Sequence, residues 1–263
     1  YFTGLEVPRS ILAIDGRTKR PMLFVPQDDP RFTNPGRPND FPGRPLVGDP
    51  ALRQLSGVDS VYADAAFEAF LAGVVARGAN VRIDVGRPGQ TGAGSVNQFE
   101  APSPGDLLVA RVRRSHSGLV VANGYDLMAS LRMIKSPAEI VVMREAARIA
   151  TVAIARGAAR VRPLLDERTL TGAFIADCMA LGAQRVPFTP IIKSGDNSLW
   201  PWRILGAHYD RRNRELRSGE LVIYDVGCER DHYVSDVGRT FPVDERFTPR
   251  QRELVELVKK ISD

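Results

Sequence analysis

The sequence predicts a mixed α/β protein, with the segregated helices and strands of an α+β arrangement, built from two domains. The chain has 263 residues, which is enough for two domains of ordinary size. Short strand-like runs and amphipathic helical patterns occur along its whole length. A helix-start signal near residues 130–136 divides the chain, so we expect domains over residues 1–130 and 131–263. Hydrophobic residues make up 43% and charged residues 25%, which excludes a disordered or fibrous chain.

The composition also argues against several functional classes. No run approaches the roughly 18 apolar residues of a membrane span, so we predict no transmembrane segment. The formal charge of +5 comes from scattered basic residues, and the densest cluster, residues 211–214 (RRNR), indicates a solvated loop. We therefore expect neither nucleic acid nor a membrane as a partner. Cys178 and Cys228 are too few for a disulfide framework and permit a reducing compartment.

The N-terminal part is predicted to begin with a hairpin. Residues 10–26 alternate apolar runs with a polar turn at residues 15–17, which is typical of two short strands. Residues 26–50 are rich in Pro, Gly, Asn and Asp, and they are expected to form a loop. A helix is predicted over residues 62–77, where one face carries Phe67, Phe70, Leu71 and Val74.

The next stretch offers weaker signals. Strands are expected near residues 80–85 and 118–122. Residues 86–94 are rich in Gly but lack the Gly-Lys-Ser/Thr ending of a phosphate loop, so a plain loop is predicted. The chain starts at Tyr1, not Met, and stops at Asp263 inside a helical pattern, so we expect residues to be missing at both ends.

The C-terminal part is predicted to begin with a well-capped helix. In residues 136–139 (SPAE), the serine can cap free N–H groups, the proline suits the first helical position and the glutamate can complete a capping box. The helix is expected over residues 137–160. Its candidate buried stripe consists of Ile140, Met143, Ala147, Ile149 and Ile154.

The remaining elements follow in order. A second helix is expected over residues 166–181 and a strand over residues 188–193. Two strands are expected over residues 220–227 and 232–243, and a last helix is expected from residue 248.

Two aspartates in the predicted hairpin are the main candidates for chemistry. With the turn near Arg230 and Asp231, Asp225 faces Asp236 across the ladder, and their Cβ atoms should lie about 4.5–5.5 Å apart. Alternation places Asp225 on the same face as Leu221 and Ile223. Two carboxylates on such a face repel each other, and burying an unpaired one is costly. A proton, an intervening cationic side chain or a divalent cation would relieve the repulsion. The alternative is that one aspartate is solvated in the turn.

The histidines and Cys228 are weaker candidates. His208 lies seventeen residues before Asp225, and a structural or solvated role is its alternative. His232 is expected to be exposed beside the turn, and His116 is expected in a loop. Cys228 could bind metal as a thiolate, but a small buried residue is the preferred interpretation.

Residues 221–229 (LVIYDVGCE) and 235–243 (SDVGRTFPV) closely resemble the first metal-binding hairpin of aminopeptidase P. This family comprises Xaa-Pro aminopeptidases of the creatinase/prolidase group with the pita-bread fold. The eleven-residue step from Asp225 to Asp236 matches, and His208 falls where the family has a His-Tyr pair. Residues 133–140 (MIKSPAEI) resemble the start of the family's catalytic domain, and residues 1–4 (YFTG) resemble a segment of its N-terminal domain.

The resemblance implies a fold and a set of roles. Residues 1–130 would be an incomplete creatinase-like N-terminal domain, and residues 131–263 would be the first half of a pita-bread domain. Asp225 would bind one of two divalent metal ions, usually manganese in this group, and Asp236 would bridge both. His208 would contact the substrate and stabilise the tetrahedral intermediate. The substrate would be a peptide with proline in second position, which loses its first residue.

Several expectations concern what this chain lacks. The family's site also needs a histidine and two glutamates from the second half of the fold, and none of those motifs is present. We therefore expect this chain alone to be inactive, with an exposed apolar face where the other half would pack. The full-length protein is expected to be a homo-oligomer in the cytoplasm, although a periplasmic or secreted location stays open.

Alternatives remain at this stage. Prolidase, which cuts Xaa-Pro dipeptides, shares the hairpin. A peptidase-like module that binds peptides without catalysis is the alternative from another class. Trp200 and Trp202 could line a specificity pocket, but local packing is the preferred interpretation.

Overall fold

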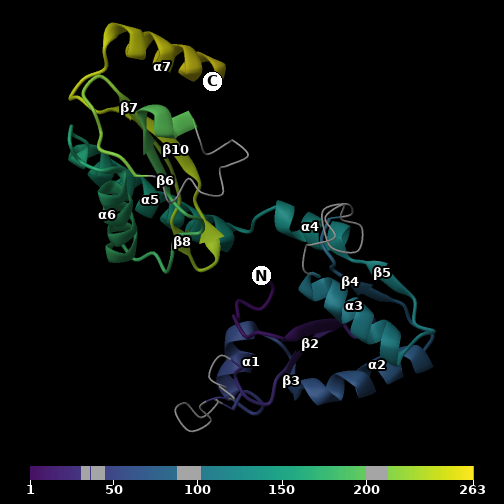
Figure 1. Ribbon diagram of the computed structural model, residues 1–263. Helices are drawn as coiled ribbons and strands as arrows, with labels where there is room; N and C mark the ends of the chain where they lie inside the picture. The colour runs from purple at the N-terminus through teal and green to yellow at the C-terminus, as the bar shows by residue number, and fades with distance from the viewer. Residues whose placement is uncertain (31–35, 37–44, 88–101, 200–212, 263) are drawn as a thin grey trace. The chain divides into compact units, whose positions relative to one another are not determined.

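The computed structural model describes residues 1–263 except 31–35, 37–44, 88–101, 200–212 and 263 (Figure 1). The chain divides into two compact units, residues 1–134 and residues 135–263. The division falls within the 130–136 interval that carries the helix-start signal. Among the described residues, no helix is both long enough and apolar enough to cross a membrane.

The first unit is built around a three-stranded sheet of order β1-β2-β3. Strands β1 (Ile11–Asp15) and β2 (Arg20–Val25) form the predicted antiparallel hairpin, with Ile11 opposite Phe24. Strand β3 (Ser60–Ala63) runs parallel to β2.

The predicted helix over residues 62–77 starts too early. Residues 60–63 are strand β3, a short 3₁₀ turn covers Asp64–Ala66, and helix α2 occupies Phe67–Ala76. Tyr62 belongs to the sheet, where its ring stacks on Phe24 with a centroid distance of 5.5 Å. The helical face begins only at Phe67, because the residues before it pair with a strand far away in the sequence.

Three helices of the first unit were not predicted. They are α1 (Pro50–Ser56), α3 (Pro104–Ser115) and α4 (Tyr125–Met133). His116, which was expected in a loop, is the C-cap residue of α3. The expected strands near residues 80–85 and 118–122 are confirmed as the parallel pair β4 (Val81–Ile83) and β5 (Val121–Asn123). Among its described residues, the unit has two buried clusters, and the larger one consists of Phe24, Phe67, Leu71, Val74, Ile83, Val112 and Leu119.

The second unit begins with helix α5 (Pro137–Arg160), and its predicted capping box is confirmed. The Glu139 backbone N–H donates to Ser136 Oγ over 3.3 Å, and the Ser136 N–H donates to Glu139 Oε2 over 2.7 Å. The predicted buried stripe is wrong in its first half, because Ile140, Met143 and Ala147 are exposed. The buried positions follow a different phase of the helix: Ala146, Ile149, Ala150, Ala153, Ile154 and Gly157.

The predicted helix over residues 166–181 is helix α6 (Glu167–Ala180), which packs beside α5 and is capped by Asp166. A three-stranded antiparallel sheet of order β10-β7-β6 follows. Its strands are β6 (Ile191–Ser194), β7 (Leu221–Val226) and β10 (Val237–Pro242). The short pair β8 (Glu229–Arg230) and β9 (Tyr233–Val234) extends the hairpin between β7 and β10. Helix α7 (Pro249–Ser262) ends the unit.

The sheet packs one face against α5 and α6 (Figure 1). Val222, Tyr224 and Val226 of β7 are at most 1% exposed and belong to one buried cluster with residues of both helices. Because side chains alternate along a strand, the residues between them point to the opposite face. That face of β7 carries Leu221, Ile223 and Asp225.

Candidate metal centre

Asp225 is the one acidic residue of β7, and it lies on the face turned away from the helices. Its apolar neighbours Val222, Tyr224 and Val226 hold the strand in the core, which fixes the direction of the carboxyl group. Asp225 is half-buried, with Ile191 of β6 directly opposite it on one side and Gly238 of β10 on the other.

The predicted direct pairing of Asp225 with Asp236 is wrong by a small shift of register. Asp225 pairs with Gly238, and Val226 pairs with Val237. The turn was predicted at Arg230 and Asp231. It lies one residue later, at Asp231 and His232, which adopt positive φ angles of 47° and 67°. Such a two-residue turn matches the twist of the strands.

The corrected register still brings the two aspartates together. Asp236 precedes Gly238 by two residues, so it lies on the same face of the hairpin as Asp225 and is its diagonal neighbour. Their carboxyl groups interact, and this interaction affects the ionisation of Asp225. Asp225 is half-buried while Asp236 is exposed, so the pair opens towards the surface of the unit.

The hairpin is tightened next to the pair. Gly227 has no side chain, and a Cβ atom there would lie 2.1 Å from the Ser235 carbonyl oxygen. Cys228 N–H donates to Ser235 Oγ over 3.0 Å, and Ser235 Oγ donates to the Cys228 carbonyl over 3.1 Å. These buried contacts hold the two strands of the hairpin where the ladder between β7 and β10 is interrupted.

The tip of the hairpin is also anchored. Tyr233 Oη donates to Glu139 Oε1 over 2.6 Å, which connects the tip to the first turn of α5. Glu229 is nearly buried, and its Oε1 accepts from Arg185 Nε over 2.8 Å. His232 is exposed at the turn, as predicted.

The electrostatics of the pair favour a bound cation. Burial raises the pKa of Asp225, and the neighbouring Asp236 carboxyl group raises this pKa further by repulsion and by hydrogen bonding. A divalent cation between the two groups would replace this repulsion with attraction. Carboxylate oxygens are the donors that Mg²⁺, Ca²⁺ and related hard ions take, so the donor set fits a divalent metal.

The pair does not form a complete coordination shell by itself. Within the described ranges, no group of three or more His, Cys, Asp and Glu side chains is placed to hold a metal ion. His208, the third candidate from the sequence, lies outside the described residues, as do Trp200, Trp202 and the first two residues of the 211–214 cluster.

Cys228 is buried as expected, but it is not a free thiol. It forms a disulfide with Cys178 of α6, with an S–S distance of 2.00 Å. No local pattern predicts this pairing, because the two cysteines are 50 residues apart and meet only through the packing of α6 on the sheet. A disulfide sulfur is no thiolate, so the geometry removes Cys228 from the candidate ligands.

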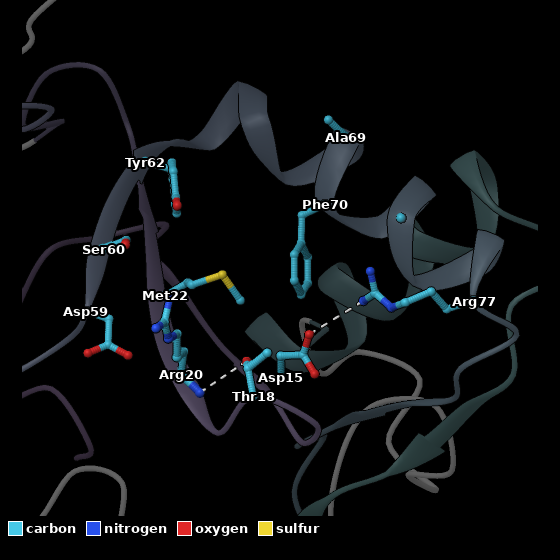
Figure 2. A pocket seen from close by; sticks show the side chains of 11 residues that line it. Asp15, Thr18, Arg20, Met22, Asp59, Ser60, Tyr62, Ala69, Phe70 and Arg77 are labelled. Carbon is cyan, nitrogen blue, oxygen red and sulfur yellow. Dashed lines mark hydrogen bonds and ion pairs between the residues drawn. The ribbon is translucent and has the colours of Figure 1, made fainter.

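The first unit contains a separate surface pocket of about 360 Å³. Figure 2 shows Met22, Tyr62 and Phe70 around its centre, with the Asp15–Arg77 ion pair at one side. The pair spans 3.6 Å between Arg77 Nη2 and Asp15 Oδ2. The residues that line this pocket all belong to residues 1–134, so the pocket is distinct from the aspartate pair.

Comparison with known proteins yields matches that cover the hairpin with the two aspartates. Residues 141–263, which include both aspartates, match the model of metallopeptidase family M24. Within the family, the chain is similar to aminopeptidase P. It is 31% identical to Xaa-Pro aminopeptidase 3 of Mus musculus over 99% of this chain and 48% of that protein. It is 38% identical to the Xaa-Pro aminopeptidase of Escherichia coli over 49% of this chain and 28% of that protein.

Solved structures show the same relationship. Zinc-substituted E. coli aminopeptidase P in complex with product superposes with a TM-score of 0.74 at 28% identity, over 99% of this chain and 56% of that one. The predicted family and fold class are thus confirmed. The chain spans about half the length of the curated Xaa-Pro aminopeptidase 3 that it matches.

Proposed function

We propose that the complete protein is a metal-dependent Xaa-Pro aminopeptidase, which removes the first residue from peptides that carry proline in second position. The observation that carries this proposal is the Asp225–Asp236 pair on one face of a hairpin that lies within the match to family M24. The names of the relatives, Xaa-Pro aminopeptidases from mammals and bacteria, support the substrate class.

In this proposal, unit 135–263 is the first half of a pita-bread catalytic domain, and unit 1–134 is its creatinase-like N-terminal domain. Asp225 and Asp236 hold two divalent ions together with one histidine and two glutamates from outside this chain. Such ions, when bound, supply Lewis-acid activation of water and of the scissile carbonyl group. We propose manganese as the metal.

The residues of this chain contribute binding and orientation. With the ions bound, Asp225 would be a ligand of one ion and Asp236 would be a ligand shared by both. Ser235 and Cys228 fix the hairpin between these two ligands through their paired hydrogen bonds. His208 contacts the substrate in this assignment.

Partners and location are part of the proposal too. A homo-oligomer is proposed for the full-length protein. A cytoplasmic location accords less well with the Cys178–Cys228 disulfide, because disulfides persist mainly in oxidising compartments. A periplasmic or secreted location therefore fits this bond better.

The test compares peptides on the full-length, metal-loaded protein. We expect release of the first residue from an Xaa-Pro-Xaa tripeptide and little cleavage of the matched Xaa-Ala-Xaa peptide. Preferred cleavage of the Xaa-Pro dipeptide would instead identify a prolidase, and no cleavage with no metal would identify a binding module.

Variants of the aspartates make the test specific to this site. Asp225→Asn and Asp236→Asn should each lower kcat/KM by at least about 100-fold, since each removes a metal ligand. Asp231→Asn is the matched control, because Asp231 lies in the same hairpin but at its exposed turn, where Asn tolerates a positive φ. Equal losses in all three variants would contradict the assignment.

A further inference from the structure

A second acidic group of the C-terminal unit is buried and has no part in the metal chemistry proposed above. Glu167, the first residue of α6, is 0% exposed. Its Oε1 accepts from the Ser194 backbone N–H over 2.8 Å and from Ser194 Oγ over 3.1 Å. Its Oε2 accepts from Asn197 Nδ2 over 2.9 Å and lies 3.4 Å from Lys193 Nζ. Four donors therefore converge on one carboxyl group.

Burying these charged groups costs desolvation free energy. The side chains of Lys193 and Glu167 are only 7% and 0% exposed, so both charged groups are largely removed from water. A buried ion pair of this kind adds little net stability compared with apolar residues of the same size. Its effect is to hold its partners in one arrangement, because any displaced partner would leave a buried polar group unpaired.

The partners of Glu167 lie at the end of the strand that flanks the aspartate pair. Lys193 and Ser194 are the last two residues of β6, and Ile191, three residues before Ser194, pairs directly with Asp225. Glu167 thus fixes the end of the strand whose other end forms the wall beside Asp225. Glu167, in the first turn of α6, is thus connected to Asp225 through the four residues of β6.

Hydrogen bonds around Glu167 also connect the residues that come before and after the 200–212 segment. Asn197 lies just before this segment and binds Glu167, whereas Arg214 lies just after it. Arg214 Nη1 donates to the Ser194 carbonyl over 3.1 Å, and the Glu167 backbone N–H donates to the Arg214 carbonyl over 3.1 Å.

Gly195 permits this close approach. Its φ is +46°, and a Cβ atom there would lie 2.0 Å from Arg214 Nη1 and 2.5 Å from Glu220 Oε1. The Arg214–Glu220 ion pair, 2.8 Å between Nη2 and Oε1, therefore packs directly on the glycine backbone. The chain on either side of residues 200–212 is held against the start of α6.

We propose that Glu167 is a positioning residue: its buried carboxyl group fixes the end of β6, the strand whose first residue pairs with Asp225, and the two flanks of residues 200–212. It touches no substrate and no metal, and it acts through Ser194, Asn197 and Lys193. Its effect on catalysis rests on the proposed aminopeptidase function. Its effect on the conformation of the flanks does not.

The first arm of the test measures conformation without any enzymatic activity. The two tryptophans of the chain, Trp200 and Trp202, follow Asn197 by three and five residues in the sequence, so their fluorescence reports on this region. We compare acrylamide quenching in the 263-residue chain for the wild type, Glu167→Gln and Glu167→Gln/Lys193→Met. The double variant also removes the ammonium group that pairs with Glu167 in the wild type.

Asp177→Asn is the matched control. Asp177 is also a nearly buried carboxylate of α6, but it binds Arg156 and Arg160 of α5 and forms no hydrogen bond or ion pair with β6 among the described residues. We expect the quenching constant to change at least about twofold in both Glu167 variants and to stay unchanged in Asp177→Asn. Unchanged quenching in a folded double variant would overturn the proposal, and so would an equal change in the control.

The second arm uses the full-length, metal-loaded protein. The double variant should keep its metal content and regain most of the thermal stability lost in Glu167→Gln. Its kcat/KM for an Xaa-Pro-Xaa peptide should nevertheless stay about 10–100-fold below that of the wild type. Full activity in the double variant would show that Glu167 serves stability alone and would overturn the proposal. An inactive wild type would reject the aminopeptidase function, and the fluorescence comparison would still decide the role of Glu167.

Discussion

At the scale of single residues, Asp225 combines an apolar strand environment with an acidic neighbour. Its raised pKa has burial as its larger cause and Asp236 as its smaller one. A carboxyl group with a raised folded-state pKa favours the folded state while it is protonated. This contribution is fully present below the ordinary value of 3.8 and is lost as the pH rises through the higher folded-state pKa.

The metal-free Asp225→Asn variant should therefore be more stable than the wild type at pH 7. The variant keeps a neutral side chain at all pH values, so the difference in the free energy of unfolding should shrink as the pH falls towards 3.8. Urea unfolding of the metal-free chain across this range measures the difference. A variant that is less stable than the wild type at neutral pH would contradict the assigned repulsion.

Tyr224 offers a second test on the opposite face of the same strand. Its hydroxyl group is buried without a hydrogen-bond partner in the described structure, and burial raises its pKa. Tyr224→Phe should leave the free energy of unfolding unchanged or raise it by about 1 kcal/mol, because an unsatisfied polar group is removed. Tyr224→Ala should cost about 3–5 kcal/mol through lost packing. Chemical denaturation of both variants measures this, and a large loss in the Phe variant would reveal a partner for the hydroxyl group.

At the scale of elements, what could be predicted depended on how local the cause is. The capping box of Ser136 and Glu139 involves neighbouring residues, so the sequence predicts it directly. The buried face of α5 is set by its packing against the sheet and α6. Helical periodicity alone therefore predicted burial of Ile140 and Met143, which are exposed. The strand at residues 60–63 was missed for a similar reason, because its partner β2 lies about 40 residues away.

The candidate site shows the same division. Two acidic residues in apolar strand patterns were sufficient to predict that Asp225 and Asp236 share a face. Their register depends on the backbone of Asp231 and His232 at the turn, which the residue types alone did not fix. The contacts of Glu167 with Lys193, Ser194 and Asn197 join residues 26 to 30 positions apart, and no sequence motif predicts them.

The disulfide between α6 and the end of β7 gives a prediction at this scale. It closes a loop of about 50 residues, and reduction should lower the free energy of unfolding by about 2–4 kcal/mol. Denaturation with and without dithiothreitol measures this effect. The Cys178→Ala/Cys228→Ala variant is the control and should not respond to the reductant. Two reactive thiols in the native, untreated protein would contradict the bond.

At the scale of the whole molecule, the chain is proposed to carry part of a metal centre. It spans 48% of the mouse Xaa-Pro aminopeptidase 3 that it matches, and its described residues place two acidic side chains together without a third ligand group. Two carboxylates are fewer donors than a divalent ion takes, so tight binding needs ligands from elsewhere. We expect the 263-residue chain to show no peptidase turnover, and a continuous assay with an Xaa-Pro-Xaa peptide would measure this. Robust turnover by this chain would mean that the missing ligands were wrongly assigned.

The central claim is that Asp225 and Asp236 together hold divalent metal, and metal content of the full-length protein tests it most directly. Elemental analysis after dialysis should find about two divalent ions per chain in the wild type and in Asp231→Asn. Asp225→Asn and Asp236→Asn should each lose at least one ion while the protein stays folded. Undiminished metal content in both aspartate variants would contradict the account.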